Sequence, residues 1–193
     1  MRYGPEHKLE SRRKILQASS RAIKANGPQG VSVAAVMSEA GLTHGAFYAH
    51  FTSKDDLVAA SITQMFEDSQ QRLRRVTSGK PPAMALRDYI DSYLSARHCA
   101  AVAEGCPIVA LGGETPRLDA AARAAFARGL AARQALLVEL LEAAGTPQPQ
   151  DTAQSVGSEL LGALLTARLV QGGEREQVLE SSRAALKRRL GLQ

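Results

Sequence analysis

Two short helical stretches joined by a tight turn lie near the start of the chain, between residues 32 and 51. Ser32 is a favourable N-cap for a helix over residues 33–39, and Ala40-Gly41 ends that helix because glycine readily adopts the left-handed conformation. Thr43 is a favourable N-cap for a second helix that continues to about residue 50. Apolar side chains can face inward from both helices and fix the angle between them: Val33, Val36, Leu42 and Phe47. The segment is therefore predicted to be a helix-turn-helix.

Such a unit can place its second helix in the major groove of DNA, which is about 12 Å wide, while its first helix crosses the phosphate backbone. Small side chains at Gly45, Ala46 and Ala49 would let the second helix come close to the bases. Hydroxyl and imidazole groups that can contact bases and phosphates lie beside them: Thr43, His44, Tyr48 and His50. Ser32 and Lys54 lie at helix N-termini, where free N–H groups favour phosphate. Helix-turn-helix units also serve as plain corners in helical proteins, so the turn alone leaves both interpretations open.

The charge distribution favours a polyanionic partner. Residues 1–54 hold eight Lys and Arg against three Glu, which accounts for the whole net charge of +5. Residues 55–193 hold 16 basic and 16 acidic side chains. A basic N-terminal part on a neutral remainder suits phosphate neutralisation, although charge alone equally fits a segment made basic for solubility.

The rest of the chain is predicted to be all-α. It is rich in Ala, Leu, Arg and Glu, and its aromatic content is 4%. Ser53 and Asp56 form a capping box at the start of a long helix. Nine helices are expected, over about residues 9–25, 33–39, 43–50, 54–76, 83–103, 107–111, 118–144, 151–169 and 174–190, with a break at residues 112–116.

The stretch from Ser32 to Leu57, above all residues 41–57 (GLTHGAFYAHFTSKDDL), resembles the DNA-binding domain of TetR-family bacterial transcriptional regulators. Members of this family have an N-terminal helix, a long connecting fourth helix and a divergent helical ligand domain, in agreement with the nine helices expected here. The resemblance implies a helix-turn-helix DNA-binding domain over residues 1–52 and an effector-binding and dimerisation domain over residues 53–193.

The resemblance also implies a role for each candidate DNA-binding residue. Ser32 would cap its helix against a phosphate, and Lys54 would reach a phosphate from the fourth helix. Thr43, His44 and Gly45 would lie at the end of the third helix that enters the groove, and position 44 often carries a longer basic side chain in the family. Tyr48 and His50 would reach backbone phosphates or base edges. Phe47 and Phe51 are expected in the core.

A homodimer through the last two helices is a further implication of the resemblance. These helices carry more apolar surface than a lone helix pair needs: Leu160, Leu161, Leu164 and Leu165, followed by Leu179, Leu186 and Leu190. This surface could also be only the core of the second domain. We favour the dimer, because a symmetric operator needs two DNA-binding units.

The family also implies a small-molecule pocket inside the second domain. Its candidate residues are the few aromatic, sulfur-containing and polar side chains among Ala and Leu: Met65, Phe66, Tyr89, Tyr93, Cys106, Phe126 and Gln134. Core packing is the alternative role for each of them, because pocket lining and core look alike in a sequence.

Cys106 is preceded by Gly105 and followed by Pro107, which places the thiol at the N-terminus of a short helix with proline at its first position. Free N–H groups there favour the nucleophilic thiolate, so the thiol could sense oxidants or electrophiles; the alternative is a buried, inert side chain. An all-α thiol oxidoreductase that uses Cys106, with Cys99 as its partner, is the alternative function. The chain has no CxxC, no activating histidine at a suitable spacing and no cofactor loop to support it.

Several other classes of protein are not expected. The sequence has no run of eighteen apolar residues, so no membrane span is expected. No apolar stretch follows the charged N-terminus, so no signal peptide is expected either, and we expect a cytoplasmic protein. Two cysteines are too few for a disulfide framework and lack metal-site spacing. We therefore expect a regulator without enzymatic activity, cofactor or metal. It would be a ligand-responsive repressor that binds a palindromic double-stranded DNA operator as a dimer and is released by a small-molecule or electrophile effector.

Overall fold

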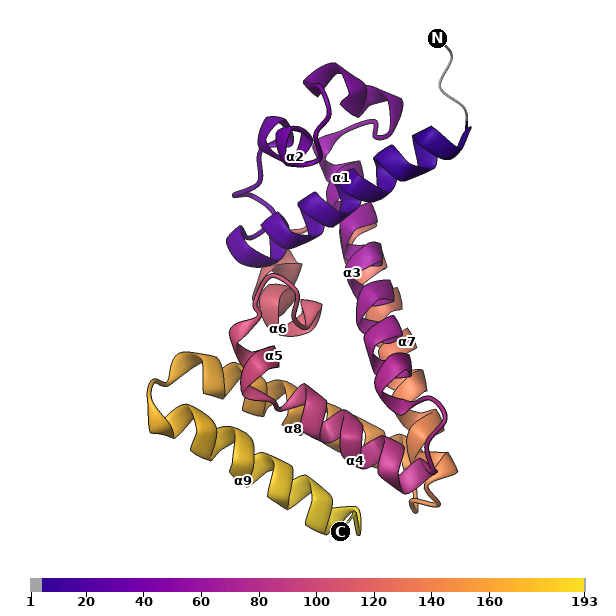
Figure 1. Cartoon of the computed structure of the whole chain (residues 1–193), viewed down its shortest axis with the longest axis vertical. Coiled ribbons are helices and arrows are strands. Elements are labelled where there is room, and N and C mark those ends of the chain that lie inside the picture. The colour runs from indigo at the N-terminus through magenta and orange to yellow at the C-terminus, as the bar shows by residue number, and fades with distance from the viewer. Residues whose placement is uncertain (1–4, 193) are drawn as a thin grey trace.

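Residues 5–192 are described by the computed structural model, and every regular element within this range is a helix (Figure 1). The elements follow one another in the order α1 (Pro5–Asn26), α2 (Val33–Glu39), η1 (His44–Ala49), α3 (Lys54–Thr77), α4 (Pro82–Tyr93), α5 (Ala96–Ala100), α6 (Pro107–Leu111), η2 (Gly112–Arg117), α7 (Ala120–Ala143), α8 (Pro149–Leu169) and α9 (Gly173–Arg189), where η marks a 3-10 helix. The predicted all-α class is confirmed for the described residues.

The head of the molecule consists of α1, α2 and η1, which gather at one end (Figure 1). Two glycines in the left-handed conformation shape its turns: Gly27, with a φ of 74°, follows α1, and Gly41, with a φ of 71°, follows α2. Ser32 caps α2, because its hydroxyl accepts a hydrogen bond from the Ala35 amide at 3.5 Å. The predicted helix-turn-helix is therefore present.

The second helix of this unit differs from the prediction. The segment His44–Ala49 is a 3-10 helix rather than an α-helix, and Thr43 makes no side-chain capping bond. The Ala46 amide bonds to the Thr43 carbonyl at 3.1 Å, and the His50 amide bonds to the Phe47 carbonyl at 2.9 Å, which is the i to i+3 pattern. Six residues that include a glycine give little drive to propagate an α-helix.

The long helix α3 connects the head to the rest of the molecule and begins as predicted. The Asp56 amide donates to the Ser53 hydroxyl at 3.0 Å. The Asp56 carboxylate in return accepts from the amide of Thr52 at 2.9 Å, one residue earlier than in the standard capping box. α3 then lies side by side with α7, which runs in the same direction away from the head (Figure 1).

The body of the molecule consists of α4 to α9, and it corrects the predicted continuous helix over residues 83–103. The chain bends after Tyr93, and Ser95 caps the new helix α5 by accepting from the His98 amide at 3.1 Å. The His98 ring nitrogen Nδ1 closes the bend at 2.6 Å from the Tyr93 carbonyl oxygen. Ser95 at the N-cap and His98 three residues later favour the start of a new helix over the continuation of α4. The predicted break at residues 112–116 is instead the 3-10 helix η2.

Apolar side chains form two clusters. One surrounds Phe47, Phe51 and Phe66 and joins the head to the first half of α3, to α6 and to the start of α7. The other lies among α4, α7, α8 and α9 around Leu86, Leu160 and Leu186. The domain boundary predicted after residue 52 lies at the start of α3, whose first half contributes to the head's cluster. Among residues 5–192, no helix is both long and apolar enough to cross a lipid bilayer.

Candidate DNA-binding surface and effector cavity

Aromatic packing holds the helix-turn-helix in place. Phe47 and Phe51 are each 2% exposed, and their rings stack at a centroid distance of 5.6 Å. The Arg12 guanidinium of α1 lies over the Phe51 ring at 4.3 Å, and its Nη1 donates to the His50 carbonyl at 2.5 Å. Both phenylalanines lie in the core, as the sequence predicts. The orientation of η1 is thus fixed by α1 as well as by the turn.

The candidate DNA contacts fall into two groups. Thr43, His44, Gly45 and Tyr48 are exposed on η1 and its N-cap, at the far end of the head (Figure 1), and 69% of Tyr48 is accessible. The other candidates are Ser32, His50 and Lys54. Ser32 is exposed at the start of α2, but its hydroxyl already bonds the Ala35 amide. His50 is half-buried, and the half-buried Lys54 donates from Nζ to the Gln29 carbonyl at 3.2 Å. The structure therefore brings together one exposed polar surface on η1, with the other three candidates at its margin.

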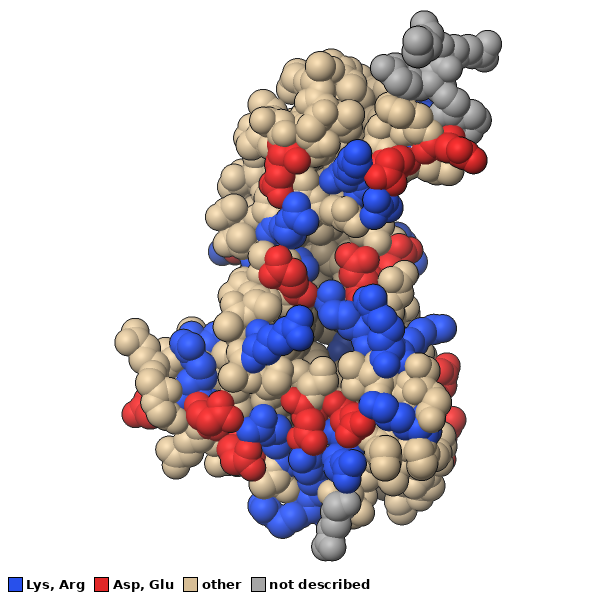
Figure 2. Space-filling view, in the orientation of Figure 1, with Lys and Arg blue, Asp and Glu red and all other residues tan. Residues whose placement is uncertain are grey.

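The basic side chains of the head lie away from this surface. The sequence has no Lys or Arg between residues 25 and 53, and the surface over α2 and η1 carries none in Figure 2. On α1, Arg13 pairs with Glu10 at 2.8 Å and Arg21 with Glu39 at 2.6 Å. Lys24 is buried, and desolvation lowers its pKa to about 8. Total charge therefore overstates how much free positive charge the head offers, because the sequence does not show which cations are paired or buried.

His50 stays neutral at physiological pH. Desolvation, and then the nearby positive charges of Lys8 and Arg12, lower the pKa of its imidazole below the usual value of 6.5. Its Nδ1 atom is buried and has no hydrogen-bond partner among the described residues. A neutral imidazole can still accept or donate a hydrogen bond at a DNA backbone.

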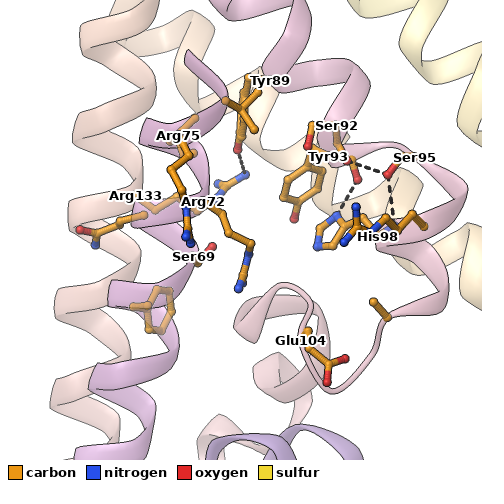
Figure 3. Close-up of a pocket in the computed structure, with 16 residues that line it drawn as sticks. Ser69, Arg72, Arg75, Tyr89, Ser92, Tyr93, Ser95, His98, Glu104 and Arg133 are labelled. Atoms are coloured by element: carbon orange, nitrogen blue, oxygen red, sulfur yellow. Dashed lines mark hydrogen bonds between the residues drawn. The ribbon is translucent and has the colours of Figure 1, made fainter. Parts of the chain in front are cut away.

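A cavity of about 520 Å³ opens below the head, walled by the second half of α3, α4, the segment around α5, and α7 (Figure 3). Its size falls within the range usual for small-molecule sites. Apolar and polar side chains both line it: Phe66, Ser69, Gln70, Arg72, Leu73, Arg75, Val76, Tyr89, Ser92, Tyr93, Ser95, Arg97, His98, Ala101, Glu104 and Arg133.

The cavity contains some of the predicted pocket residues. Phe66, Tyr89 and Tyr93 line it, whereas the other four lie elsewhere: Met65, Cys106, Phe126 and Gln134. Met65 and Phe126 belong to the cluster around the head, and Cys106 to the cluster of the body. Gln134 lies on the side of α7 that faces α8, because its Oε1 atom would be 3.6 Å from a Cβ added at Gly157. These four lie outside the lining, although the Cys106 thiol lies beside the hydroxyl of the lining residue Tyr93.

Sequence reasoning missed the charged side chains of the cavity. The most informative is Arg133, which is only 6% exposed. It lies on the buried stripe of α7 with Phe126, Gly129 and Leu137, at spacings of three, four and four residues. A basic residue on an apolar helical stripe was the available signal, because such a position places a charge inside the protein.

Arg133 has few partners in the cavity. Its Nη2 donates to the Tyr89 hydroxyl at 3.3 Å, and its guanidinium lies 5.5 Å from the centroid of the Tyr93 ring (Figure 3). The Tyr93 hydroxyl is buried and has no oxygen or nitrogen hydrogen-bond partner within residues 5–192; the weakly hydrogen-bonding Cys106 thiol lies beside it. Burial raises the pKa of Tyr89 and of Tyr93, so both hydroxyls stay protonated and can donate.

Both cysteines are free thiols, and both are buried. Cys106 is the N-cap of α6 with Pro107 at the first helical position, as predicted, but it is 1% exposed. Cys99 lies in α5 and is 3% exposed. Among the described residues, no group of three His, Cys, Asp or Glu side chains is arranged to hold a metal ion.

Two family models match the chain. Residues 15–61 match the model of bacterial regulatory proteins of the tetR family, and residues 82–175 match the C-terminal domain of LmrA/YxaF-like transcriptional regulators. A curated relative from Bacillus subtilis (strain 168), the uncharacterized HTH-type transcriptional regulator YerO, is 29% identical over 84 residues, which are 42% of this chain and 29% of that protein. The chain thus matches less than a third of that relative's length.

Solved structures share the fold along nearly the whole chain. Reduced E. coli NemR has a TM-score of 0.81 at 23% identity, over 92% of this chain and 95% of that one. A TetR transcriptional regulator from Chloroflexus aurantiacus J-10-FL also has a TM-score of 0.81, at 19% identity, over 97% and 98% of the two chains. SCO4454 from Streptomyces coelicolor, a TetR-family regulator, has a TM-score of 0.77 at 21% identity, over 95% of each. The helix-turn-helix, the helical body and both family models agree: the chain belongs to the TetR family of bacterial transcriptional regulators.

Proposed function

We propose that this regulator is a repressor that binds a palindromic operator as a homodimer and leaves it when a small molecule occupies the cavity. The observation that carries the proposal is the connection made by α3. This one helix begins at Lys54, beside the exposed surface of η1, and its second half lines the cavity through Phe66, Ser69, Arg72, Arg75 and Val76.

A rigid link of this kind couples the two sites. A ligand that changes the position of α3 against α7 also moves the head, because α1 packs on the first half of α3. In a dimer, that motion changes the separation of the two η1 surfaces. Release follows when the separation no longer matches successive major grooves, about 34–36 Å apart.

The exposed face of α8 supports dimerisation through this helix, whereas Leu179 and Leu186 of α9 are buried within the protomer. Val156, Leu160 and Leu164 are fully buried within the protomer, whereas Leu165 is 47% exposed and Leu169, one turn further on, is 76% exposed. An added side chain at Gly162, one turn earlier on α8, meets nothing within 4 Å. A second copy can therefore pack closely on this stripe, which would give the head-to-head symmetry that a palindrome requires.

Gel shifts on the DNA upstream of the protein's own gene test this function. We expect a complex that resists competitor DNA at moderate salt and weakens steeply as salt rises. A complex that competitor DNA of any sequence removes equally well would contradict the proposal.

The electrophile route to release is the weaker alternative. Cys106 is 1% exposed, so a reagent reaches its thiol only after the body opens. A Cys106→Ser variant should therefore respond to effectors as the wild type does, and loss of the response to electrophiles alone in that variant would favour the thiol route. The burial of Cys99 and Cys106 also gives the thiol oxidoreductase alternative no accessible nucleophile.

A further inference from the structure

We propose that the cavity between α3, α4 and α7 binds an anionic ligand with an aromatic or similarly apolar body, and that Arg133 pairs with the acidic group of that ligand. This inference rests on the proposed function, because it names the chemical class of the effector. The observations behind it are the polar side chains that line the cavity, which the fold alone does not determine.

The first argument is the buried charge of Arg133. The residue is 6% exposed, and its guanidinium is positively charged at any physiological pH. The described residues provide it with no carboxylate partner, and its one hydrogen bond goes to the neutral Tyr89 hydroxyl. A buried cation without a counter-ion is unfavourable, whereas an anion bound beside it would pair with the charge and accept the remaining N–H groups.

The second argument is the Tyr93 hydroxyl. Tyr93 is 7% exposed, and its buried hydroxyl has no oxygen or nitrogen partner among residues 5–192; the group beside it is the Cys106 thiol, which forms only weak hydrogen bonds. It lies in the cavity wall close to the guanidinium of Arg133 (Figure 3). A buried donor of this kind is unfavourable, and an acidic oxygen placed between Tyr93 and Arg133 would accept from both.

The charged side chains that line the cavity are mostly positive. Besides Arg133, the lining includes Arg72, Arg75 and Arg97 against the single carboxylate of Glu104. Figure 2 shows basic side chains gathered at this level of the molecule. Arg72 is itself half-buried, and its Nη2 lies 3.5 Å from the Gly105 carbonyl. A cationic ligand would be repelled here, and a neutral one would leave Arg133 unpaired.

The remaining wall selects the body of the ligand. Phe66, Leu73, Val76 and the ring of Tyr89 supply apolar surface, and flat rings pack well against aromatic side chains. The chemistry that fits is therefore a carboxylate, sulfonate or acidic phenol carried on an aromatic or similarly apolar scaffold.

Two probes with the same ring system separate the charge from the rings. 1-Anilinonaphthalene-8-sulfonate carries a sulfonate, and N-phenyl-1-naphthylamine is its neutral counterpart. Fluorescence titration of both probes, with one site per protomer checked by calorimetry, should be made on the full chain and on Arg133→Gln. We expect Arg133→Gln to weaken binding of the sulfonate at least tenfold and to change binding of the neutral probe less than twofold. An equal effect on both probes, or no effect on either, would overturn the proposal.

Arg128→Gln is the matched control, because Arg128 lies on the same helix, is exposed and does not line the cavity. It should leave both titrations unchanged. Tyr93→Phe provides a second variant if Arg133→Gln folds poorly: loss of the unpaired hydroxyl should weaken the sulfonate about threefold or more and leave the neutral probe unaltered. Unchanged sulfonate binding in Tyr93→Phe would count against the proposal.

Gel shifts of the same proteins keep the two proposals distinguishable. Selective sulfonate binding without any specific DNA complex would leave the anion site standing and remove the repressor. A specific DNA complex without selective binding of the sulfonate would support the repressor and contradict the anion site.

Discussion

Two polar side chains in the body, Arg133 and His98, lie at positions where the helical pattern alone predicts only packing residues. Arg133 occupies an apolar stripe of α7, and His98 closes the bend between α4 and α5. Since a carbonyl oxygen only accepts, the 2.6 Å contact with Tyr93 puts the proton of the neutral His98 ring on Nδ1. Both residues therefore combine a structural contact with a place in the cavity wall.

His98 gives the protein a predicted pH dependence. Desolvation lowers the pKa of the folded imidazole below 6.5, although its bond to the Tyr93 carbonyl acts in the opposite direction. As pH falls through 6.5, the unfolded chain takes up a proton that the folded protein resists, so stability is lost toward lower pH. The melting temperature of the wild type should fall as the pH is lowered from 7.5 to 5.5, and that of His98→Gln should fall less. The pKa of His50 is also lowered, so this residue accounts for part of the decline that remains in the variant. Equal declines in the two proteins, or a His98 pKa above 6.5 by NMR, would contradict this.

Lys54, the first residue of α3, lies at the margin of the exposed surface on η1, and it tests the phosphate role directly. Lys54→Gln should weaken operator binding about equally for all sequences and lower the slope of log affinity against log salt by about 1. Fluorescence anisotropy at several salt concentrations measures both quantities. Lys80→Gln is the control, because Lys80 pairs with Asp88 in the body at 2.8 Å; an equal loss in this variant would show that net charge matters rather than position.

At the scale of elements, the closest packing is between α3 and α7. Gly129 of α7 faces Phe66 of α3 so closely that an added Cβ would lie 2.2 Å from the phenylalanine ring. Phe66 in turn meets Phe126 edge to face at a centroid distance of 5.2 Å. This close approach fixes the helix that we propose to transmit the ligand signal.

Gly129→Ala should therefore destabilise the protein. Alanine favours a helix by up to about 1 kcal/mol relative to glycine, but overpacking a tight contact costs about 1–3 kcal/mol, and the structure leaves the ring little room to move. The free energy of unfolding in urea should fall. Gly113→Ala is the control, since an added Cβ there meets nothing within 4 Å, and its effect should stay within about 0.5 kcal/mol. A stability gain at Gly129 would show that α3 and α7 adjust more freely than proposed.

The elements also show what the sequence could and could not predict. Caps and glycines are local signals, so the turns at Gly27 and Gly41 and the start of α3 at Ser53 were predictable. The bend at Ser95 was not predicted: Ser95 is a local capping signal, but the bend is closed by a contact between the His98 ring and the Tyr93 carbonyl that the sequence does not show. Of the cavity, Phe66, Tyr89 and Tyr93 were predicted from residue type, whereas Arg133 was not, since its burial depends on how α3, α4 and α7 assemble.

At the scale of the whole molecule, the proposed dimer rests on the exposed face of α8. Leu165→Glu should place a charge in that interface and convert a dimer into a monomer of 20.5 kDa in light scattering at micromolar concentration. Leu130→Glu, at a leucine of similar exposure on α7, should leave the dimer intact. A dimer that survives Leu165→Glu and dissociates with Leu130→Glu would move the interface to α7.

The most direct test of the whole account is the selection of DNA sequences by the full-length protein from a random duplex library. We predict enrichment of a palindrome whose half-sites are related by the dimer's two-fold axis. Tyr48→Ala should bind that palindrome about 1–3 kcal/mol more weakly if Tyr48 reads a base. Wild-type protein that enriches no sequence over the starting library, under conditions where it remains folded, would contradict the account.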